Sequence, residues 1–417
     1  MKPSRFKQHL NIACILLVTA CLFAACTKRT VEPHYAYNPD GTTVTDTSKA
    51  DSVASFNEPT AIALDAAGNI YVADYGNNEI REISTTGVVT TLAGNGTQGS
   101  LNGTAKNATF NGPTGLTLDA AGNVYVADNN NNQIREISSA GTVSTIAGSD
   151  SSGAVDGIGA NAYFFGPTGI VADANANLYV TDAGNELIRK VVPSTGQVTT
   201  VAGNVNVGSA NGALLSATFN NPGGITIDAS GNLYVADMLN GMIREINFGT
   251  SMVTTIAGVG DTTESLNGPD STARFYYPTG VAIDASGNIY VAEYATNLIR
   301  KIGTNGMVTT FAGSGAAGQA DSTGTSATFN GPSGLAIDKA GNLYVADTYN
   351  NVIRKITPAG VVSTIAGSGL AGSTNGKALS LHRRTLVVAH AVIRPNTLSR
   401  KSLDKIFIKR RRKSKHF

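Results

Sequence analysis

The sequence lacks tryptophan altogether, and its few cysteines and histidines all lie near the two ends of the chain. The cysteines are Cys14, Cys21 and Cys26, so residues 27–417 can form no disulfide among themselves. The histidines are His9, His34, His382, His390 and His416. Histidine is the commonest metal ligand and the usual base near neutral pH. Residues 35–381 therefore offer neither a histidine-containing zinc site nor a Ser-His-Asp triad.

The central part of the chain consists of one sequence pattern that occurs six times. The pattern reads Pro-x-Gly, a short apolar run ending in Asp, x-x-Gly-Asn, Tyr-Val-Ala-Asp, a polar loop and Ile-Arg-(Glu/Lys)-Ile. Its first aspartates recur every 54–56 residues, at Asp65, Asp119, Asp173, Asp228, Asp284 and Asp338. Its arginines recur at the same steps, at Arg81, Arg135, Arg189, Arg244, Arg300 and Arg354. A fixed period of this length predicts one supersecondary unit stacked on copies of itself.

Each repeat predicts a small sheet of four antiparallel strands. Apolar and polar residues alternate in runs of roughly five, the usual strand length, and turn residues such as Ala-Gly-Asn at 121–123 separate the runs. No helical spacing of apolar residues occurs within a repeat. A sheet with two apolar faces needs a neighbour on each side, and the end repeats carry no polar cap. We therefore predict an all-β fold, a six-bladed β-propeller of four-stranded blades.

The third repeat departs from the others in its first hairpin. Five repeats place glycine before asparagine there, as at Gly122, which suits a positive φ. The third has Ala176 in that place. Because alanine at positive φ costs about 1 kcal/mol, we expect this hairpin to change its turn type.

The N-terminus resembles a bacterial lipoprotein signal. Basic residues precede an apolar run that extends from Leu10 to Ala25 and ends at Cys26, the expected lipidation site. Cys21 is the alternative, and a signal peptide with incidental cysteines is another. We predict a signal over residues 1–26, a flexible tether over 27–54 and the propeller over 55–378. The lipid would hold the protein in the cell envelope, at the outer membrane.

The C-terminal residues 379–417 leave the pattern abruptly. They hold twelve Lys and Arg against one acidic residue, Asp404. Such a tail is either an anionic-surface or nucleic-acid patch or the product of a reading-frame slip, which would make the chain a truncated product. In the second case an uninterrupted chain would carry a seventh blade. The Thr42–Thr45 run resembles the last strand of a repeat and would complete that blade or latch onto blade six.

The propeller segment is acidic, with 25 Asp and Glu against 13 Lys and Arg over residues 51–378. Nucleic-acid binding needs a basic face. The sequence therefore disfavours a nucleic-acid partner for the propeller itself.

A second series of carboxylates ends the Tyr-Val-Ala-Asp run. Its members are Asp74, Asp128, Asp182, Asp237, Glu293 and Asp347. They could form a ring of cation ligands, but a residue present in every blade serves what every blade needs. We expect each to cap its own turn through backbone N–H groups. The repeated arginines should pair with these or other carboxylates, partly exposed and worth roughly 0–1 kcal/mol each.

These repeats resemble the NHL repeat, most clearly over residues 113–137 and their five copies. The resemblance covers about residues 55–370 and implies a six-bladed propeller with the Pro-x-Gly strand near the axis. The family includes RNA-binding and protein-binding modules, a metal-dependent amidating lyase and relatives of sugar lactonases. The lyase's metal residues have no counterpart here, since the repeats lack histidine. A carboxylate- and calcium-dependent lactonase-like hydrolase remains the alternative function; otherwise no cofactor is expected.

A unique site must break the sixfold repetition, and aromatic loop residues do so. Tyr75, Tyr294 and Tyr349 lie next to the second series of carboxylates, with Glu293 the one glutamate of that series. Phe165, Tyr276 and Tyr277 precede a proline where other repeats have Asn or Gly. Aromatic residues beside amides suit sugar faces or protein hot spots, and otherwise they pack between blades. We therefore predict a non-catalytic module that binds a protein or a glycan.

Overall fold

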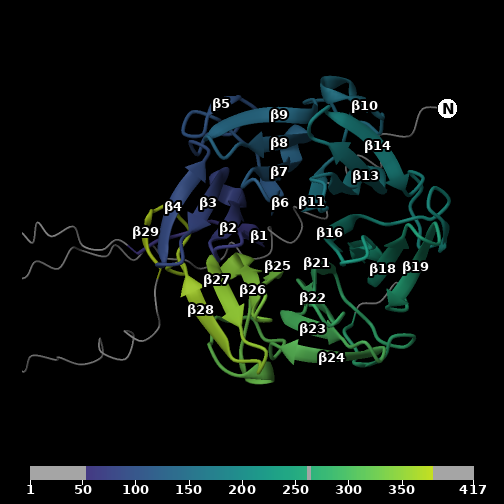
Figure 1. Ribbon diagram of the computed structural model, residues 1–417. Helices are drawn as coiled ribbons and strands as arrows, with labels where there is room; N and C mark the ends of the chain where they lie inside the picture. The colour runs from purple at the N-terminus through teal and green to yellow at the C-terminus, as the bar shows by residue number, and fades with distance from the viewer. Residues whose placement is uncertain (1–52, 261–263, 379–417) are drawn as a thin grey trace, which may run out of the picture. The chain divides into compact units, whose positions relative to one another are not determined.

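The computed structural model describes residues 53–260 and 264–378. The predicted signal, Cys21 and Cys26, the 42–45 strand and the basic tail lie outside these residues. The described chain forms six antiparallel sheets arranged as a closed ring, which confirms the predicted β-propeller (Figure 1). Within the described residues, no helix has the length and apolar character to cross a membrane.

The strands follow the repeats in order. Blade one holds β1 (Pro59–Leu64), β2 (Ile70–Asp74), β3 (Glu79–Ile83) and β4 (Val88–Ala93). Blade two holds β6 (Pro113–Leu118), β7 (Val124–Asp128), β8 (Gln133–Ile137) and β9 (Thr142–Gly148). Blade three holds β11 (Pro167–Ala172), β12 (Leu178–Asp182), β13 (Leu187–Val192) and β14 (Gln197–Ala202).

Blade four holds β16 (Pro222–Ile227), β17 (Leu233–Asp237), β18 (Met242–Asn247) and β19 (Met252–Ala257). Blade five holds β21 (Pro278–Ile283), β22 (Ile289–Glu293), β23 (Leu298–Ile302) and β24 (Met307–Ala312). Blade six holds β25 (Pro332–Ile337), β26 (Leu343–Asp347), β27 (Val352–Ile356) and β28 (Val362–Ala366).

A two-residue strand covers the outer edge of five blades, so most blades have one strand more than predicted. These short strands are β29 (Gly376–Lys377) in blade one, β5 (Gly103–Thr104), β10 (Gly157–Ile158), β15 (Gly212–Ala213) and β20 (Gly268–Pro269). Each pairs with the fourth strand of its blade, as Gly103 pairs with Val143. Covering this edge satisfies backbone groups that would otherwise invite another strand.

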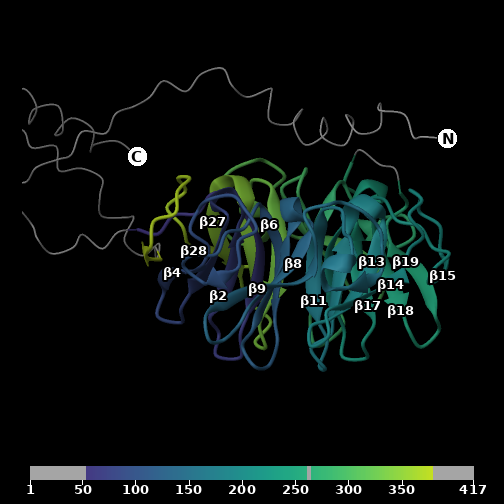
Figure 2. The same ribbon diagram turned by 90° about the horizontal axis from the view of Figure 1, so that it is seen from above.

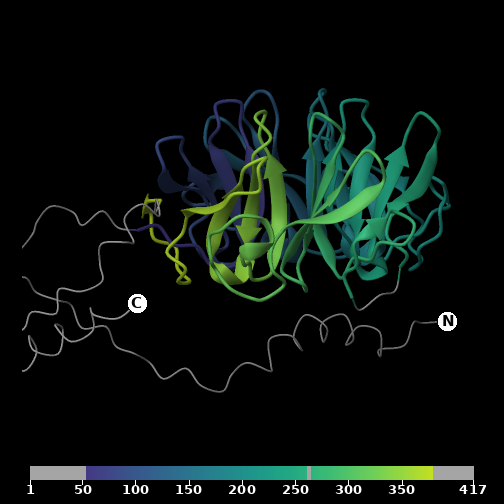
Figure 3. The same cartoon turned by 90° about the horizontal axis from the view of Figure 1, so that it is seen from below.

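The first strand of every blade lies nearest the centre of the ring and the fourth strand lies at its periphery (Figure 1). Seen edge-on, the strands run between two faces that carry the loops (Figures 2 and 3). One face carries the turn after each second strand, and we call it the turn face. Most of these turns are 3₁₀ helices: η1 (Tyr75–Asn77), η2 (Asn129–Asn131), η4 (Ala183–Asn185), η5 (Met238–Asn240) and η7 (Thr348–Asn350). Two others, η3 (Gly159–Asn161) and η6 (Gly324–Ser326), lie in inter-blade connections.

Apolar side chains between neighbouring blades form the core. Between blades one and two, Ala73 and Ile80 pack with Phe110, Val124 and Val126, all of them buried. Each fully buried valine, isoleucine or phenylalanine side chain contributes about 1.5–3 kcal/mol. The stacked blades therefore supply each other's apolar cover, as the repeat pattern predicts.

The glycine of Pro-x-Gly is required by the close approach of neighbouring first strands. A Cβ at Gly280 would lie 2.0 Å from the carbonyl oxygen of Ser333, and one at Gly115 would lie 2.2 Å from that of Thr168. Real Cβ atoms do not come so close to backbone. The narrow centre of the ring thus explains why this position favours glycine.

The ring closes by joining the two ends of the described chain in blade one. Each inter-blade connection carries Asn or Asp, then Gly or Ser, and several residues later Ala-x-Phe. In blade one Asn375 and Gly376 supply the first half, and Ala54 and Phe56 supply the second. Val53 bridges Lys377, and Ala54 N–H donates to the Lys377 carbonyl at 3.2 Å.

This closure brings blade six directly beside blade one, as the six-bladed prediction requires. The first strands β25 and β1 are direct neighbours, since a Cβ at Gly334 would lie 2.5 Å from the carbonyl oxygen of Thr60. A further blade would have to separate them. The strand that completes the outer edge of blade one is β29.

The third repeat's hairpin keeps its turn, so the predicted change is wrong. Ala176 has φ of 59°, and its N–H donates to the Asp173 carbonyl at 3.0 Å. The equivalent Gly122 N–H donates to the Asp119 carbonyl at 3.2 Å. The Asp173 carboxylate accepts two further backbone N–H groups of the loop and thereby holds alanine in the left-handed region.

Replacing Ala176 with glycine should therefore stabilise the propeller. The substitution Ala176→Gly removes the steric cost of a Cβ at positive φ, so we expect a gain of about 1 kcal/mol in unfolding free energy. Equilibrium urea unfolding measures it. The reverse change in blade two, Gly122→Ala, is the matched control and should destabilise by a similar amount. Equal midpoints for all three proteins would contradict this account of the hairpin.

Candidate functional site

The repeated arginines form buried ion pairs with the second series of carboxylates. In each blade the guanidinium Nη1 lies 2.6–2.8 Å from a carboxylate oxygen of the same blade, seven positions earlier. Both side chains of every pair are fully buried. The pairing confirms the expected partner, but the expected partial exposure is wrong.

The carboxylates of five blades also bind the start of their own blade. Asp128 Oδ1 accepts the backbone N–H of Asn111 at 2.8 Å, and its Oδ2 accepts Asn131 Nδ2 at 2.8 Å. The same backbone contact recurs at Asp74, Asp182, Asp237 and Asp347. The backbone partner is thus the residue two before the blade's proline and not the carboxylate's own turn, which corrects the capping prediction.

Each arginine ties the inter-blade connection to its blade. In blade two, Arg135 donates to the carbonyls of Thr109 and Leu101 at 3.1 Å and to Asn102 Oδ1 at 2.8 Å. Its guanidinium carbon lies 5.3 Å from the centre of the Phe110 ring. The other five arginines lie 5.0–5.5 Å from the equivalent phenylalanine rings. The planar guanidinium serves as a hub with fixed donors and a stacking face.

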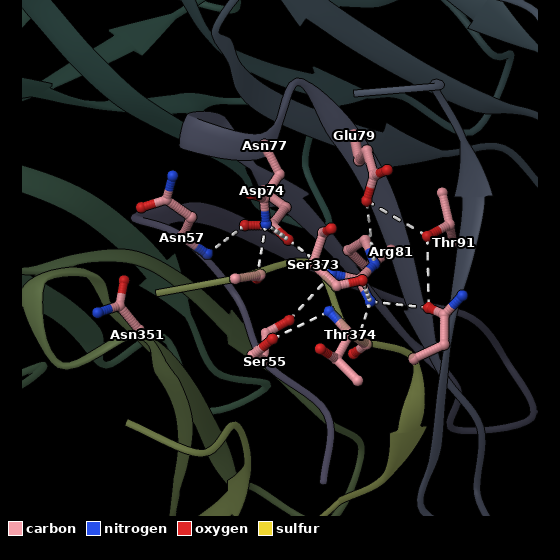
Figure 4. Close-up of polar contacts among 12 residues, drawn as sticks. Ser55, Asn57, Asp74, Asn77, Glu79, Arg81, Thr91, Asn351, Ser373 and Thr374 are labelled. Atoms are coloured by element: carbon pink, nitrogen blue, oxygen red, sulfur yellow. Dashed lines mark hydrogen bonds and ion pairs between the residues drawn. The ribbon is translucent and has the colours of Figure 1, made fainter. Parts of the chain in front are cut away.

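In blade one this hub holds both ends of the described chain (Figure 4). Arg81 donates to the Ser55 carbonyl at 3.1 Å, to the Thr374 carbonyl at 3.2 Å and to Asn375 Oδ1 at 2.8 Å. Thr374 N–H donates to Ser55 Oγ at 2.9 Å. The side chain that joins a connection to its blade elsewhere therefore closes the ring here.

Burial raises the pKa of Asp74, Asp128 and Asp182 to about 6, although backbone N–H groups, the turn asparagines and the paired arginines act to lower it. The carboxylates remain ionised at neutral pH. Their oxygens are occupied by the donors described above, so these pairs serve the structure of the blade.

A second tie joins neighbouring blades on the turn face. In each blade the residue four positions after the end of the second strand has left-handed φ and directly precedes the third strand; in blade two it is Asn132. Asn132 Oδ1 accepts the backbone N–H of Gly166 in blade three at 2.9 Å. The same contact joins Asn78 to Gly112, Asn297 to Gly331 and Asn351 to Glu58. The last of these crosses the closure between blades six and one.

Blade three has glutamate in this role. The Glu186 carboxylate accepts the N–H of Asn221 in blade four. Burial raises the pKa of Glu186 to about 7, and the negative charges of Asp237 and Asp182 add to the rise, while the Asn221 N–H opposes it. The Glu186 carboxyl, which makes this contact between blades three and four, therefore gains or loses its charge near neutral pH.

The structure brings together four of the predicted aromatic residues across blades five and six. The Tyr294 and Tyr349 rings lie 5.4 Å apart between centres, and the Tyr294 hydroxyl donates to the Tyr349 hydroxyl. The Tyr276 and Tyr277 rings lie 4.7 Å apart. Tyr294 N–H donates to the Tyr277 carbonyl at 3.2 Å, which joins the two pairs. We call Tyr276, Tyr277, Tyr294 and Tyr349 the tyrosine cluster.

The other two predicted aromatic residues lie elsewhere on the turn face. A Cβ at Gly112 would meet the Tyr75 ring at 2.8 Å, so Tyr75 lies against the start of blade two. Phe165 lies equally close to Gly184 of its own blade and is 43% exposed. Within residues 53–260 and 264–378, neither ring packs against a ring of the tyrosine cluster.

Glu293 explains why blade five differs locally. Its longer side chain reaches Arg300 Nη1 at 2.6 Å and also accepts Thr296 Oγ1 at 2.5 Å. The turn after β22 is not a 3₁₀ helix, and its backbone bond to the start of the blade begins at Tyr294, one position earlier than in the other blades. The glutamate thus supports the turn that carries Tyr294. In the described part of the chain, no group of three or more His, Cys, Asp or Glu side chains is arranged to hold a metal ion.

Sequence reasoning missed the residues that complete these ties. The phenylalanines stacked on the arginines recur at the repeat period, at Phe56, Phe110, Phe164, Phe219, Phe275 and Phe329. The asparagines that bind the next blade also hold a fixed place in most repeats. Their periodicity was visible, but only the folded ring shows which backbone groups they reach.

Comparisons with known proteins agree with this fold. The family model of the NHL repeat matches residues 56–83, 110–137, 275–302 and 329–356, which lie in blades one, two, five and six. The Arabidopsis thaliana protein SUPPRESSOR OF QUENCHING 1, chloroplastic, is 32% identical over 190 residues, 43% of this chain and 18% of that protein. The Homo sapiens NHL repeat-containing protein 2 is 34% identical over 187 residues, 41% of this chain and 26% of that protein. The chain therefore spans about a quarter or less of these relatives' length.

Solved structures share the propeller fold at low identity. A Bacteroides thetaiotaomicron protein of unknown function superimposes with a TM-score of 0.55 at 20% identity, over 75% of this chain and 71% of that chain. A Bacteroides ovatus auxiliary nutrient binding protein superimposes with a TM-score of 0.54 at 17% identity, over 75% of this chain and 70% of that chain.

Glu186 makes the stability of the ring depend on pH. Its folded pKa of about 7 lies above its ordinary value of 4.5, so the folded state holds the proton more tightly than the unfolded state. Stability should therefore fall as pH rises from about 4.5 to about 7. Glu186→Gln keeps the side chain's length and removes the ionisation. We expect its melting temperature to fall less than that of the wild type between pH 5 and pH 8. Identical pH profiles for the two proteins would rule out this role for Glu186.

Proposed function

We propose that this six-bladed β-propeller, which carries NHL repeats in blades one, two, five and six, is a non-catalytic binding module of the cell envelope. Its partner is a protein or a glycan, which it meets on the turn face. A rigid ring that presents varied loops binds by shape and contact, as other loop-bearing scaffolds do.

The observation that carries this proposal is the difference between the two faces of the ring. The turn face carries the tyrosine cluster, Tyr75 and Phe165, each at a position that differs from blade to blade. On the opposite face the hairpins repeat small and polar residues, and Phe248 is their one aromatic side chain. Side chains unique to one blade are not needed to build the others, so they are available for recognition.

The repeated charged residues support the same reading. Their carboxylates and guanidinium groups are buried, paired and bound to the backbone of the connections. A catalytic role would require such groups to be exposed in a cleft, with donor or acceptor atoms that are not already hydrogen-bonded to the backbone. The turns after the second strands present instead mainly aromatic rings, hydroxyls and amides, which suit binding.

The proposal includes attachment to the membrane through Cys26, with Cys21 as the alternative. Acyl chains on the cysteine would anchor the protein, and residues 27–52 would link it to the ring. Cell fractionation tests this part. Cys26→Ser should move the protein from the membrane to the soluble fraction, whereas Cys21→Ser should leave the protein in the membrane fraction. The opposite pattern would assign the anchor to Cys21, and no shift with either variant would remove the anchor from the proposal.

An affinity experiment tests the binding function. The detergent-solubilised full chain is immobilised and exposed to an envelope extract, and retained glycan and protein are measured. Tyr294→Ala/Tyr349→Ala should lose the retained material because it removes two of the four rings of the tyrosine cluster, including that of the exposed Tyr349. Phe248→Ala, on the opposite face, is the control and should keep it. Retention unaffected by the tyrosines, or calcium-dependent hydrolysis of a lactone that chelation abolishes, would contradict the proposal.

A further inference from the structure

The turns that form the tyrosine cluster, and their counterparts in the other blades, hold few charged side chains, although the adjoining connection carries the Arg274–Glu264 ion pair. Two sets of residues make up these turns in every blade: the two that precede the first strand and the three that follow the second strand. Across the six blades these positions hold amides, threonines, small residues, aromatic residues and the apolar Met238 and Leu239, and Glu58 is the single charged side chain among them. Such a surface offers stacking faces and hydrogen-bonding groups without ionic attraction for a charged partner.

The rings of the cluster are held in place by the backbone beneath them. A Cβ at Gly331 would lie 2.8 Å from the Tyr349 ring and 3.1 Å from the Tyr294 ring, so both rings lie against this glycine. The hydroxyl contact between Tyr294 and Tyr349 fixes them further. Tyr349 nevertheless remains 37% exposed. Rings already fixed in place lose little freedom on binding, which favours affinity.

Tyr277 is held in a strained backbone conformation. Its φ is 52°, in the left-handed region that bulky residues avoid. The equivalent positions also have positive φ and hold Glu58, Gly112, Gly166, Asn221 and Gly331. Glycine or asparagine would fit this position with less strain. A tyrosine retained at a strained position and stacked on Tyr276 points to a use for its side chain.

From these observations we propose that the tyrosine cluster is the binding site of a neutral oligosaccharide, with successive sugar rings lying on the aromatic rings of blades five and six. The inference rests on the proposed binding function and assigns its ligand class. Aromatic side chains present apolar faces that match the C–H faces of sugars, and the tyrosine hydroxyls can bond to sugar hydroxyls. An anionic polysaccharide or phosphorylated ligand would need basic side chains, which these positions lack.

Direct titration tests the assignment with the full chain in detergent. The probes are the hexasaccharides of cellulose, laminarin, mannan and starch, together with hexagalacturonate as the anionic comparison. Calorimetry gives the affinity, and tyrosine fluorescence offers a second readout because the chain has no tryptophan. The variants are Tyr349→Ala, Tyr349→Phe and Tyr277→Gly, with Phe248→Ala as the control on the opposite face.

We expect at least one neutral hexasaccharide to bind and hexagalacturonate not to bind. Tyr349→Ala and Tyr277→Gly should each weaken binding at least tenfold, Tyr349→Phe should weaken it less, and Phe248→Ala should leave it unchanged. Tyr277→Gly relieves backbone strain, so its melting temperature should not fall, and its loss of affinity cannot then be ascribed to misfolding. Failure of every neutral probe to bind, tyrosine-independent binding, or binding of hexagalacturonate alone would overturn the assignment.

The same variants distinguish a sugar ligand from a protein ligand. If no neutral probe binds but a purified envelope protein binds the wild type and not Tyr349→Ala, the sugar assignment falls and the binding function stands. If the turn-face variants alter binding of neither class, both proposals fall.

Discussion

The whole ring depends on one buried interaction, the pairing of a guanidinium with a carboxylate inside each blade. Removing two charges from water costs several kcal/mol each unless every donor and acceptor finds a partner. Here Asp128 and Arg135 offset most of that cost by binding the chain segments that lead into their own blade, and Nε of Arg135 is the one guanidinium nitrogen of the pair without a hydrogen-bond partner. The pair therefore specifies how a connection must run between blades, in addition to joining two strands. This requirement accounts for the appearance of an arginine and a carboxylate at these two positions in all six repeats.

The same interaction sets where the ring ends. Arg81 binds Ser55 from one end of the described chain and Asn375 from the other, in the places that Thr109 and Asn102 occupy around Arg135. Closure thus needs no special element. It follows from dividing one ordinary connection between the two ends of the ring. Because the repeated residues are buried in this framework, variation is left to the turn face, where the tyrosine cluster lies.

Much of the fold was predictable from the sequence. The sequence predicted the blades and their number from three features: the period of the Asp and Arg series, the strand-length runs and the Pro-x-Gly motif. It could do so because each repeat has nearly the same residues and therefore forms the same strands and turns. The repeat pattern could not show that Asp74 and Arg81 are fully buried, since alternation along a strand does not say what covers its outer part. The connection containing Phe56 supplies that cover, and its role depends on contacts made only after the ring has closed.

The site was predictable in part and for a different reason. Four residues stood out because they break the repetition: Tyr276, Tyr277, Tyr294 and Tyr349. The sequence could not show that they lie close together across two blades, because their proximity depends on the turn that Glu293 supports. Ala176 shows the opposite limit: its local preference was read correctly, yet the Asp173 loop contacts outweigh it. Local propensity decides a turn only where the surrounding bonds leave it free to change.

The central claim is that the arginine–carboxylate pair fastens the connection to the blade and, in blade one, closes the ring. Native-state hydrogen exchange of Asp74→Asn/Arg81→Met, compared with Asp237→Asn/Arg244→Met, tests it most directly, because each double variant removes the pair without leaving a lone buried charge. The account predicts that the first variant loses protection at both residues 53–57 and 371–378, and that the second loses it only in the connection around residues 208–219. Unchanged protection of both end segments in the first variant would contradict it.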